Sequence, residues 1–337
     1  MCSMVAQSAQ NKDVVQRDAI LTGIRVHGGP DLLDALSAKG TIEIMLNPDG
    51  RLWIEKLGED IKPLCDSKGH EMTMRRDQAE GMINVIASSL GTICNAQHPI
   101  MDKAEFPFDG SRFSCALPPV VKAPAFCIRK RPDRVYTLEE YVESGIMTKK
   151  QHDVICQSVA DHKNMVIIGG TSSGKTTLTN AIINEVVRQY PLERIFVFED
   201  TSEIQCDHPN ALFYRTAENV DMSYLLRLAL RMRPDRICVG EVRDYAALDL
   251  MDAWNTGHDG GVCTIHANDA RRGLTRIEGL ISRHQHKPAC IQDVVGESVH
   301  NVIFIRKTED KGRRVEMIIE VNGYDHSKND YNFRQIG

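Results

Sequence analysis

In the C-terminal part of the chain, the spacing of hydrophobic and polar residues changes repeatedly between that of β-strands and that of α-helices. From about residue 137 onward, short apolar runs are followed by longer segments with the spacing of amphipathic helices. The runs that predict strands are 165–169, 194–198, 236–239 and 262–266, and the segments that predict helices are 175–188, 221–232, 244–255 and 270–282. This alternation predicts a parallel sheet flanked by helices, with two last strands at 302–306 and 315–321.

The N-terminal third has a different pattern. Residues 41–54 predict a β-hairpin, because two β-rich runs surround Asn47-Pro-Asp-Gly50. The other predicted helices are 18–25, 32–39 and 76–90, and the other predicted strands are 111–117 and 125–129. We therefore predict an N-terminal α+β domain at 1–130, a linker region at 131–148 and a second domain at 149–337.

A charged, proline-containing segment, Arg129-Lys-Arg-Pro-Asp-Arg134, marks the break between the first domain and the linker region. Thr137 and Glu140 follow it with the spacing of a capping box, which predicts the start of a helix.

Composition narrows the class of protein. The 337 residues carry a net charge of −5, so no overall positive field attracts nucleic acid, and we expect no direct sequence-specific nucleic-acid binding. Ten cysteines include no C-x-x-C pair, which argues against a zinc ribbon or a redox motif. The first 15 residues lack the pattern of a signal peptide and no apolar run approaches 18 residues, so we expect a cytoplasmic protein with a frayed N-terminus.

A glycine-rich loop follows the strand predicted at 165–169. Gly169 to Thr176 has the pattern G-x-x-x-x-G-K-T between a strand and a helix, the context in which this pattern cradles nucleotide phosphates. Lys175 reaches the β- and γ-phosphates, and the Thr176 hydroxyl suits Mg²⁺. The sequence predicts ATP and Mg²⁺ as ligands, and the nucleotide contacts are Gly170, Thr171, Ser172, Ser173, Gly174, Lys175, Thr176 and Thr177.

Acidic residues follow the strand predicted at 194–198, where Glu199, Asp200 and Glu203 lie close together. Carboxylates at the end of such a strand hold a metal-bound water or orient an attacking one. We take Glu199 and Glu203 as candidate catalytic residues, and Glu199 with Thr176 as candidate Mg²⁺ ligands. A solvated acidic loop is the alternative.

The strand predicted at 236–239 leads into Gly240, Glu241 and Arg243. Phosphate-loop proteins keep a metal ligand or a general base at the end of such a strand. Because Gly240 stands where an aspartate is usual, metal ligation falls on Thr176 and the acidic cluster. Glu241 becomes the candidate general base, and Arg243 is a further candidate catalytic residue.

His266 ends the strand predicted at 262–266, between Thr264 and Asn268. In this position an imidazole is placed to contact the γ-phosphate and to report its hydrolysis. The alternative is a histidine that forms hydrogen bonds within a turn.

Together and in this order, the four clusters resemble those of the type II/type IV secretion ATPase superfamily, in which they are called Walker A, the Asp box, Walker B with a Gly-Glu pair, and the His box. The resemblance covers nearly all of residues 110–300. The detailed sequence of these clusters is most similar to that of the conjugal-transfer ATPases of the TrbB type. The stretches that carry this similarity are Arg-Met-Arg-Pro-Asp-Arg-Ile, Val-Gly-Glu-Val-Arg and Leu-Asp-Leu-Met-Asp-Ala-Trp-Asn-Thr-Gly-His.

The resemblance implies an α/β fold: a RecA-like P-loop NTPase domain at the C-terminus and a smaller α+β domain at the N-terminus. It implies a homo-hexameric ring in which arginines of the N-terminal domain approach the phosphates, and Arg112 and Arg129 are the matching positions. It also implies peripheral membrane association on the cytoplasmic face of the inner membrane, with inner-membrane components of a secretion or conjugation machine as partners.

Our leading hypothesis is ATP hydrolysis that powers conjugative DNA transfer or type IV secretion. A type II secretion or pilus-retraction ATPase is the nearest alternative. The lack of a C-x-x-C pair counts against the assembly ATPases of that branch, which usually carry a four-cysteine zinc element, but not against the retraction ATPases.

A nucleic-acid-binding motor on the same fold is disfavoured by the negative charge and the aromatic content of 6%. A scaffold that binds ATP without turnover is disfavoured by Glu241.

Overall fold

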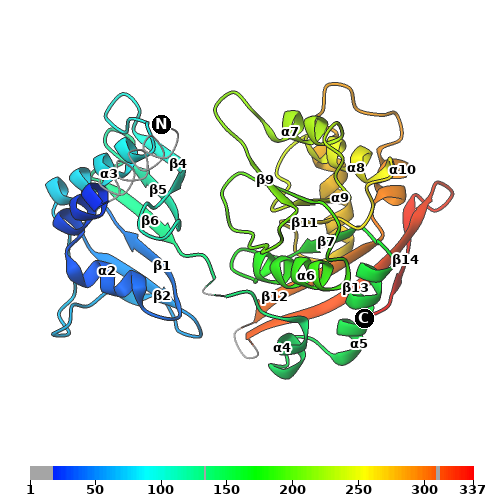
Figure 1. Ribbon diagram of the computed structural model, residues 1–337, viewed down its shortest axis with the longest axis horizontal. Coiled ribbons are helices and arrows are strands. Elements are labelled where there is room, and N and C mark those ends of the chain that lie inside the picture. Colours follow the sequence, from blue (N-terminus) through cyan, green and yellow to red (C-terminus); the bar gives the residue numbers. More distant parts are fainter. Residues whose placement is uncertain (1–17, 133, 309–311) are drawn as a thin grey trace, which may run out of the picture. The chain divides into compact units, whose positions relative to one another are not determined.

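The computed structural model describes residues 18–132, 134–308 and 312–337. The chain divides into two compact units, Met1–Asp133 and Arg134–Gly337 (Figure 1). The expectations of a frayed N-terminus and of no signal peptide concern residues that lie almost entirely outside the described part. Among the described residues, no helix is both long and apolar enough to cross a membrane.

The first unit contains an antiparallel six-stranded sheet in the order β3-β2-β1-β6-β5-β4. Its strands are β1 (Thr41–Leu46), β2 (Leu52–Lys56), β3 (Lys62–Pro63), β4 (Ile100–Glu105), β5 (Arg112–Ala116) and β6 (Ala125–Arg129). The predicted hairpin is confirmed as β1 and β2. The strands predicted at 111–117 and 125–129 are confirmed as β5 and β6.

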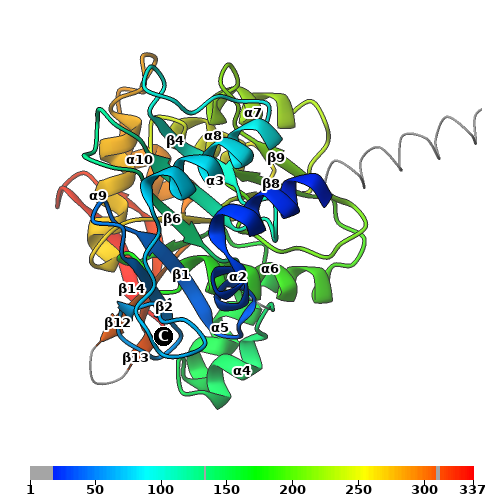
Figure 2. The same cartoon turned by 90° about the vertical axis from the view of Figure 1, so that its left-hand side faces the viewer.

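Helices cover one face of this sheet (Figure 2). They are residues 18–28, α2 (Pro30–Ser37) and α3 (Arg76–Ser89). In β5 and β6 every second residue is buried, so one face of each strand joins the core and the other face stays partly exposed. Phe113 and Phe126 lie on the core face, against Met82 and Ile86 of α3 in one cluster.

The second unit is built on an eight-stranded sheet in the order β14-β13-β12-β7-β11-β10-β8-β9. The six strands from β12 to β9 run parallel, and β13 and β14 complete one edge in antiparallel pairing. These strands are β7 (Met165–Ile168), β8 (Ile195–Glu199), β9 (Ala211–Arg215), β10 (Arg236–Val239), β11 (Val262–Ile265), β12 (Asn301–Thr308), β13 (Gly312–Asp325) and β14 (Asp330–Gln335).

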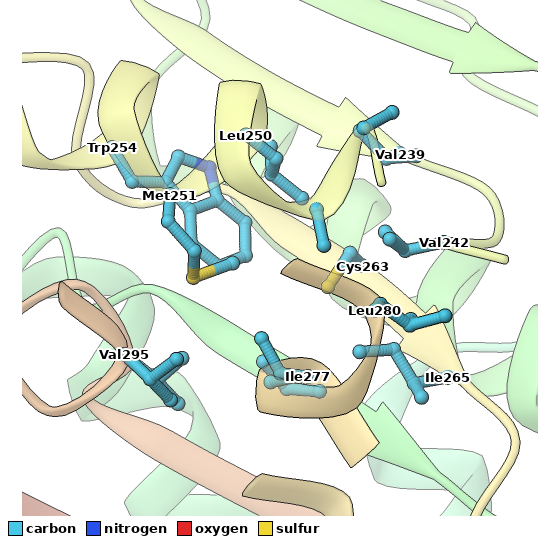
Figure 3. Packing of buried hydrophobic residues seen from close by; sticks show 14 of the residues in the cluster. Val239, Val242, Leu250, Met251, Trp254, Cys263, Ile265, Ile277, Leu280 and Val295 are labelled. Carbon is cyan, nitrogen blue, oxygen red and sulfur yellow. The ribbon is translucent and has the colours of Figure 1, made fainter. Parts of the chain in front are cut away.

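Both faces of this sheet are covered by helices, as a parallel sheet requires. One face packs on α4 (Leu138–Glu143), α5 (Lys149–Ala160) and α6 (Lys175–Gln189). The other packs on α7 (Met222–Ala229), α8 (Ala247–Asn255), α9 (Ala270–Ile281) and α10 (Ile291–Ser298). Figure 3 shows side chains of α8, α9 and α10 gathered against β10 and β11. Because these central strands are buried on both faces, their C-terminal ends are held firmly in place.

The predicted helix starting after Thr137 is confirmed. The Thr137 hydroxyl accepts a hydrogen bond from the Glu140 N–H, and the Glu140 carboxylate accepts one from the Thr137 N–H. This helix, α4, packs in the core of the second unit. The helix predicted at 221–232 is shorter than expected, because it ends at Ala229 and Arg233 adopts a left-handed conformation before Pro234.

Candidate nucleotide-binding site

The candidate site lies at one edge of the second sheet, where the parallel strands end. The phosphate loop, residues 169–174, connects the end of β7 to the start of α6. Glu199 is the last residue of β8, while Glu241 and His266 follow the ends of β10 and β11. The carboxyl ends of parallel strands form the usual ligand-binding edge of such a sheet. The topology therefore brings the four clusters to this edge.

The backbone of the phosphate loop has two left-handed residues, Ser172 with φ 56° and Gly174 with φ 96°. Gly169 is required for a different reason: a Cβ atom there would lie 2.2 Å from the Ile305 carbonyl oxygen of β12. A side chain at position 169 would push the loop off its neighbouring strand. These constraints explain the glycines of the motif in structural terms.

Lys175 begins α6 and is 8% exposed. Its Nζ donates to the carbonyl oxygens of Gly169 at 3.0 Å and Gly170 at 2.8 Å. The same nitrogen lies 3.3 Å from His266 Nδ1. The lysine head is thus held over the loop beside the N-terminal end of a helix, where an anion is favoured.

The loop fits a polyphosphate. Ser173 is 2% exposed, and its hydroxyl has no hydrogen-bond partner among the residues that the structure describes. A buried hydroxyl without a partner is costly, and a phosphate oxygen at the loop would satisfy it. Thr171, Thr176 and Thr177 lie in the same loop and in the first turn of α6.

The acidic cluster is organised by Glu199, which is 5% exposed. Its Oε1 accepts hydrogen bonds from the backbone N–H groups of Glu203 and Ile204, each at 2.8 Å. The carboxylate that contacts Thr176 is that of Glu203, because Thr176 Oγ1 donates to Glu203 Oε2 at 3.2 Å. Thr176 and Glu203 are thus the neighbouring oxygen ligands available to Mg²⁺, which binds few protein groups when phosphates share it.

Gly240 stands in place of the usual aspartate because Glu199 occupies the adjacent space. A Cβ atom at Gly240 would lie 3.0 Å from Glu199 Cγ and 3.2 Å from its Oε1. The two residues belong to paired strands, since Gly240 N donates to the Phe198 carbonyl oxygen at 2.8 Å. The carboxylate at this place in the site is therefore supplied by β8 instead of β10.

Replacing Gly240 with alanine should displace Glu199 and lower the free energy of unfolding by about 1–3 kcal/mol, the usual cost of overpacking. Urea denaturation would measure it. Gly279→Ala in α9 is the matched control, because a Cβ atom there has no neighbour within 4 Å and alanine favours a helix. Equal stability of the Gly240→Ala variant and the wild type would contradict this explanation.

Glu241 lies between the side chains of Arg243 and His266. Its Oε2 accepts from Arg243 at 2.6 Å, and its Oε1 lies 3.3 Å from His266 Nε2. Burial acts to raise the pKa of Glu241, but the hydrogen bond and charge of Arg243, with weaker effects of His266 and Lys175, outweigh burial and lower this pKa below its ordinary value. Glu241 is thus held as a carboxylate.

Arg112 and Arg129 are brought together in the first unit. They face each other directly across the β5–β6 pair, on the partly exposed side of both strands. Glu43 lies opposite Arg129 on the other side and accepts a hydrogen bond from Cys127 Sγ at 2.6 Å. The result is a row of charged side chains across three neighbouring strands.

Sequence analysis placed Asp200 in the acidic cluster without giving it a role, and it missed Thr201 and Arg313. Asp200 accepts from Thr216 Oγ1 at 2.6 Å and lies 3.9 Å from Arg243. Thr201 is buried, and its hydroxyl is unpaired within the described ranges. Both belong to the acidic cluster, so their position in that motif was the available signal. Arg313 of β13 also contacts the phosphate loop, at Ser172, and no local pattern marks it.

A phosphate loop between β7 and α6, with acids and a histidine at the ends of the adjacent parallel strands, defines a P-loop nucleotide-binding protein of RecA-like α/β fold. The chain belongs to the type II/IV secretion system protein family, which matches residues 34–331. It is 45% identical over 296 residues to a probable conjugal transfer protein TrbB of Sinorhizobium fredii, covering 88% of each chain. The resemblance inferred from the four clusters is therefore confirmed, including its likeness to the TrbB type.

More distant relatives and solved structures agree with this assignment. The type IV secretion system protein PtlH of Bordetella pertussis is 28% identical, over 80% of this chain and 86% of that protein. The Legionella pneumophila ATPase DotB aligns with a TM-score of 0.59 and 20% identity, covering 84% of this chain and 77% of that one. The pilus retraction motor PilT with bound ADP aligns with a TM-score of 0.61 and 19% identity, covering 86% and 80%. These structural similarities confirm the predicted fold class.

Proposed function

We propose that this protein hydrolyses ATP to power a conjugative DNA-transfer or type IV secretion machine. The observation that carries the proposal is the convergence of three chemical groups at the phosphate loop. His266 lies between Lys175 and Glu241, with its Nδ1 3.3 Å from Lys175 Nζ and its Nε2 3.3 Å from Glu241 Oε1. These residues come from three separate segments of the chain, and their meeting is what phosphoryl transfer to water requires.

Transfer of a phosphoryl group depends mainly on positioning and on stabilising negative charge. The phosphate loop and Lys175 hold the phosphates, and Thr176 with Glu203 or Glu199 would hold Mg²⁺. Bound Mg²⁺ would supply neutralisation of phosphate charge at this place.

Glu241 positions the attacking water in this proposal. Its lowered pKa keeps it ionised, so it accepts a hydrogen bond from water throughout the neutral range. Arg243 holds the carboxylate in place through the 2.6 Å contact. His266 links the water-orienting acid to the phosphate-binding lysine, which suits it to respond to loss of the γ-phosphate.

The transport class rests on the similarity to conjugal transfer proteins. Two TrbB proteins, from Sinorhizobium fredii and Rhizobium radiobacter, are each 45% identical over 88% of this chain. PilT is only 19% identical and supports the shared fold. This difference favours conjugation or type IV secretion over pilus retraction.

The assembly and location belong to the same proposal. We propose a homo-hexamer that associates peripherally with the cytoplasmic face of the inner membrane through inner-membrane components of the machine. The proposed domains are residues 1–130 and the ATPase domain at 149–337, joined by a linker region at 131–148 whose helix α4 packs with the ATPase domain. Arg112 and Arg129 would meet the phosphates of the nucleotide, which suits their side-by-side placement on β5 and β6.

The proposal is tested by measuring ATP turnover of the purified protein together with its mass by light scattering, with and without Mg-ATP. We expect Mg²⁺-dependent turnover and a particle of about six chains. A monomer that binds ATP and never hydrolyses it, even with membrane components of its machine present, would contradict the proposal and favour a scaffold.

A further inference from the structure

Arg313 lies on the phosphate loop although it is far from the loop in the sequence. It is the second residue of β13, and its Nε donates to the Ser172 carbonyl oxygen at 3.2 Å. A Cβ atom at Gly174 would lie 3.1 Å from Arg313 Cδ. The aliphatic stem of Arg313 thus rests on the last glycine of the loop while its head group contacts the left-handed Ser172.

Within the described residues, the guanidinium of Arg313 contacts a backbone carbonyl and no carboxylate. Among the residues that the structure describes, the Ser172 carbonyl is the hydrogen-bond partner of Arg313, and this arginine forms no ion pair. Other arginines of the same antiparallel strands do form ion pairs, since Arg306 lies 3.1 Å from Glu316 and Arg334 lies 2.8 Å from Glu320. Arg313 is also half-buried, so its charge is screened less than that of a fully exposed arginine.

A second cation lies directly opposite. Lys307 of β12 pairs in register with Arg313, so two positive side chains share one face of an antiparallel pair. At the loop itself, Arg313 and Lys175 contribute two positive charges, which a bound anion would neutralise.

Arg313 approaches from the side opposite the catalytic candidates. In the sheet, β7 lies between β12 and β11; Glu241 and His266 follow the strands on the β11 side, whereas Arg313 belongs to the β12–β13 side. Glu241 and His266 are proposed to act at the γ-phosphate. A cation on the other side of the loop therefore serves the phosphates that ADP and ATP share.

We propose that Arg313 is a nucleotide-positioning residue, which holds the phosphate loop through Ser172 and offers its terminal nitrogens to the phosphates common to nucleoside di- and triphosphates. The inference deepens the proposed function and rests on nucleotide binding at this loop. Its role is to set affinity for the nucleotide, separately from the hydrolytic step.

The test measures the dissociation constants of ADP and ATP by calorimetry with Mg²⁺, and steady-state kcat and KM, for the full chain. Arg313→Met keeps the stem on Gly174 and removes the charge, and Arg313→Gln is a second charge-free variant. Both should weaken ADP and ATP binding about tenfold, a typical effect of one charge-assisted hydrogen bond, and should change kcat less than about threefold. Arg313→Lys should recover most of the affinity, because it restores the charge.

Arg314→Gln is the matched control. It removes the same charge from the next residue of β13, whose side chain points to the other face of the sheet, and its nucleotide affinity should equal that of the wild type. Melting temperatures of the nucleotide-free proteins show whether each variant is folded.

Unchanged ADP and ATP affinity in a folded, charge-free variant would overturn the inference while leaving the proposed function intact. A purely structural role would also overturn it, and it would appear as a lower melting temperature without nucleotide and no rescue by lysine. Wild-type protein that binds neither nucleotide would overturn the proposed function itself.

Discussion

Replacing Lys175 with alanine should abolish ATP turnover, with kcat/KM lower by roughly 100- to 1,000-fold, the range found when one charge-stabilising donor is removed from an active site. The lysine head is held by two carbonyl oxygens of the phosphate loop and by His266. Arg313 contacts the loop at Ser172, on the side away from His266, so it does not take the place of the lysine head. Release of inorganic phosphate, measured over a range of Mg-ATP concentrations, gives kcat/KM.

Lys150→Ala is the control for this experiment. Lys150 is exposed on α5 of the same unit, so the variant loses the same charge without touching the loop. It should hydrolyse ATP like the wild type. If Lys175→Ala kept more than about a tenth of wild-type kcat/KM while Lys150→Ala was unaffected, the phosphate loop would not be the site of hydrolysis.

Changing Glu241 to glutamine should leave ATP binding near its wild-type strength and lower kcat by roughly 100-fold, a typical contribution of a positioned acid–base group. Glutamine has the same shape and can still accept a hydrogen bond from Arg243. It loses the negative charge that polarises water. Equilibrium binding and single-turnover hydrolysis, measured on one preparation, separate the two effects.

Glu218→Gln offers a matched control, because Glu218 is an exposed carboxylate of the same unit, in the turn that follows the edge strand β9. Its turnover should be unchanged. If the Glu241→Gln variant hydrolysed ATP at the wild-type rate, Glu241 would have no part in the mechanism and Glu203 would become the better candidate.

The pH dependence of turnover follows from the lowered pKa of Glu241. The pKa of Glu241 in the folded protein is lower than its ordinary value of 4.5, so Glu241 keeps its negative charge at and above that pH. The same shift stabilises the fold above the unfolded pKa, and this stabilisation is lost as the pH falls through the folded pKa. Protonation of Glu241 should therefore reduce kcat/KM only below about pH 4.5. A fall in kcat/KM near neutral pH that disappeared in Glu241→Gln would contradict this assignment.

The strands that sequence reasoning found and those that it missed differ in their place in the sheets. The interior strands of both sheets were predicted, because burial on one or both faces leaves a strong apolar pattern. The missed strands β3, β4, β9 and β14 are the edge strands of the two sheets. An edge strand buries fewer side chains, and β9 and β14 are accordingly exposed at several positions, so their sequences resemble loops.

The candidate site likewise contains residues that the sequence predicted and contacts that only the structure shows. The phosphate loop, Glu199, Glu241 and His266 were found because each follows an apolar run that marks the end of a strand. The reason for Gly240 was not readable from the sequence, because the side chain that excludes a larger residue comes from the neighbouring strand. The contact of Glu203 with Thr176 was also hidden, since it depends on how the acidic loop folds back over α6.

The sequence by itself determined the interior strands of the second unit, the helices α6 to α9, the phosphate loop and the family, because short-range spacing and apolar runs carry that information. Only the tertiary structure decided which of these segments meet. Lys175 and His266 are 91 residues apart, and Ser172 and Arg313 are 141 residues apart. Such contacts depend on the order of strands in the sheet, which places β11 on one side of β7 and the β12–β13 pair on the other. That order results from the packing of the whole unit, and no local stretch of the chain encodes it.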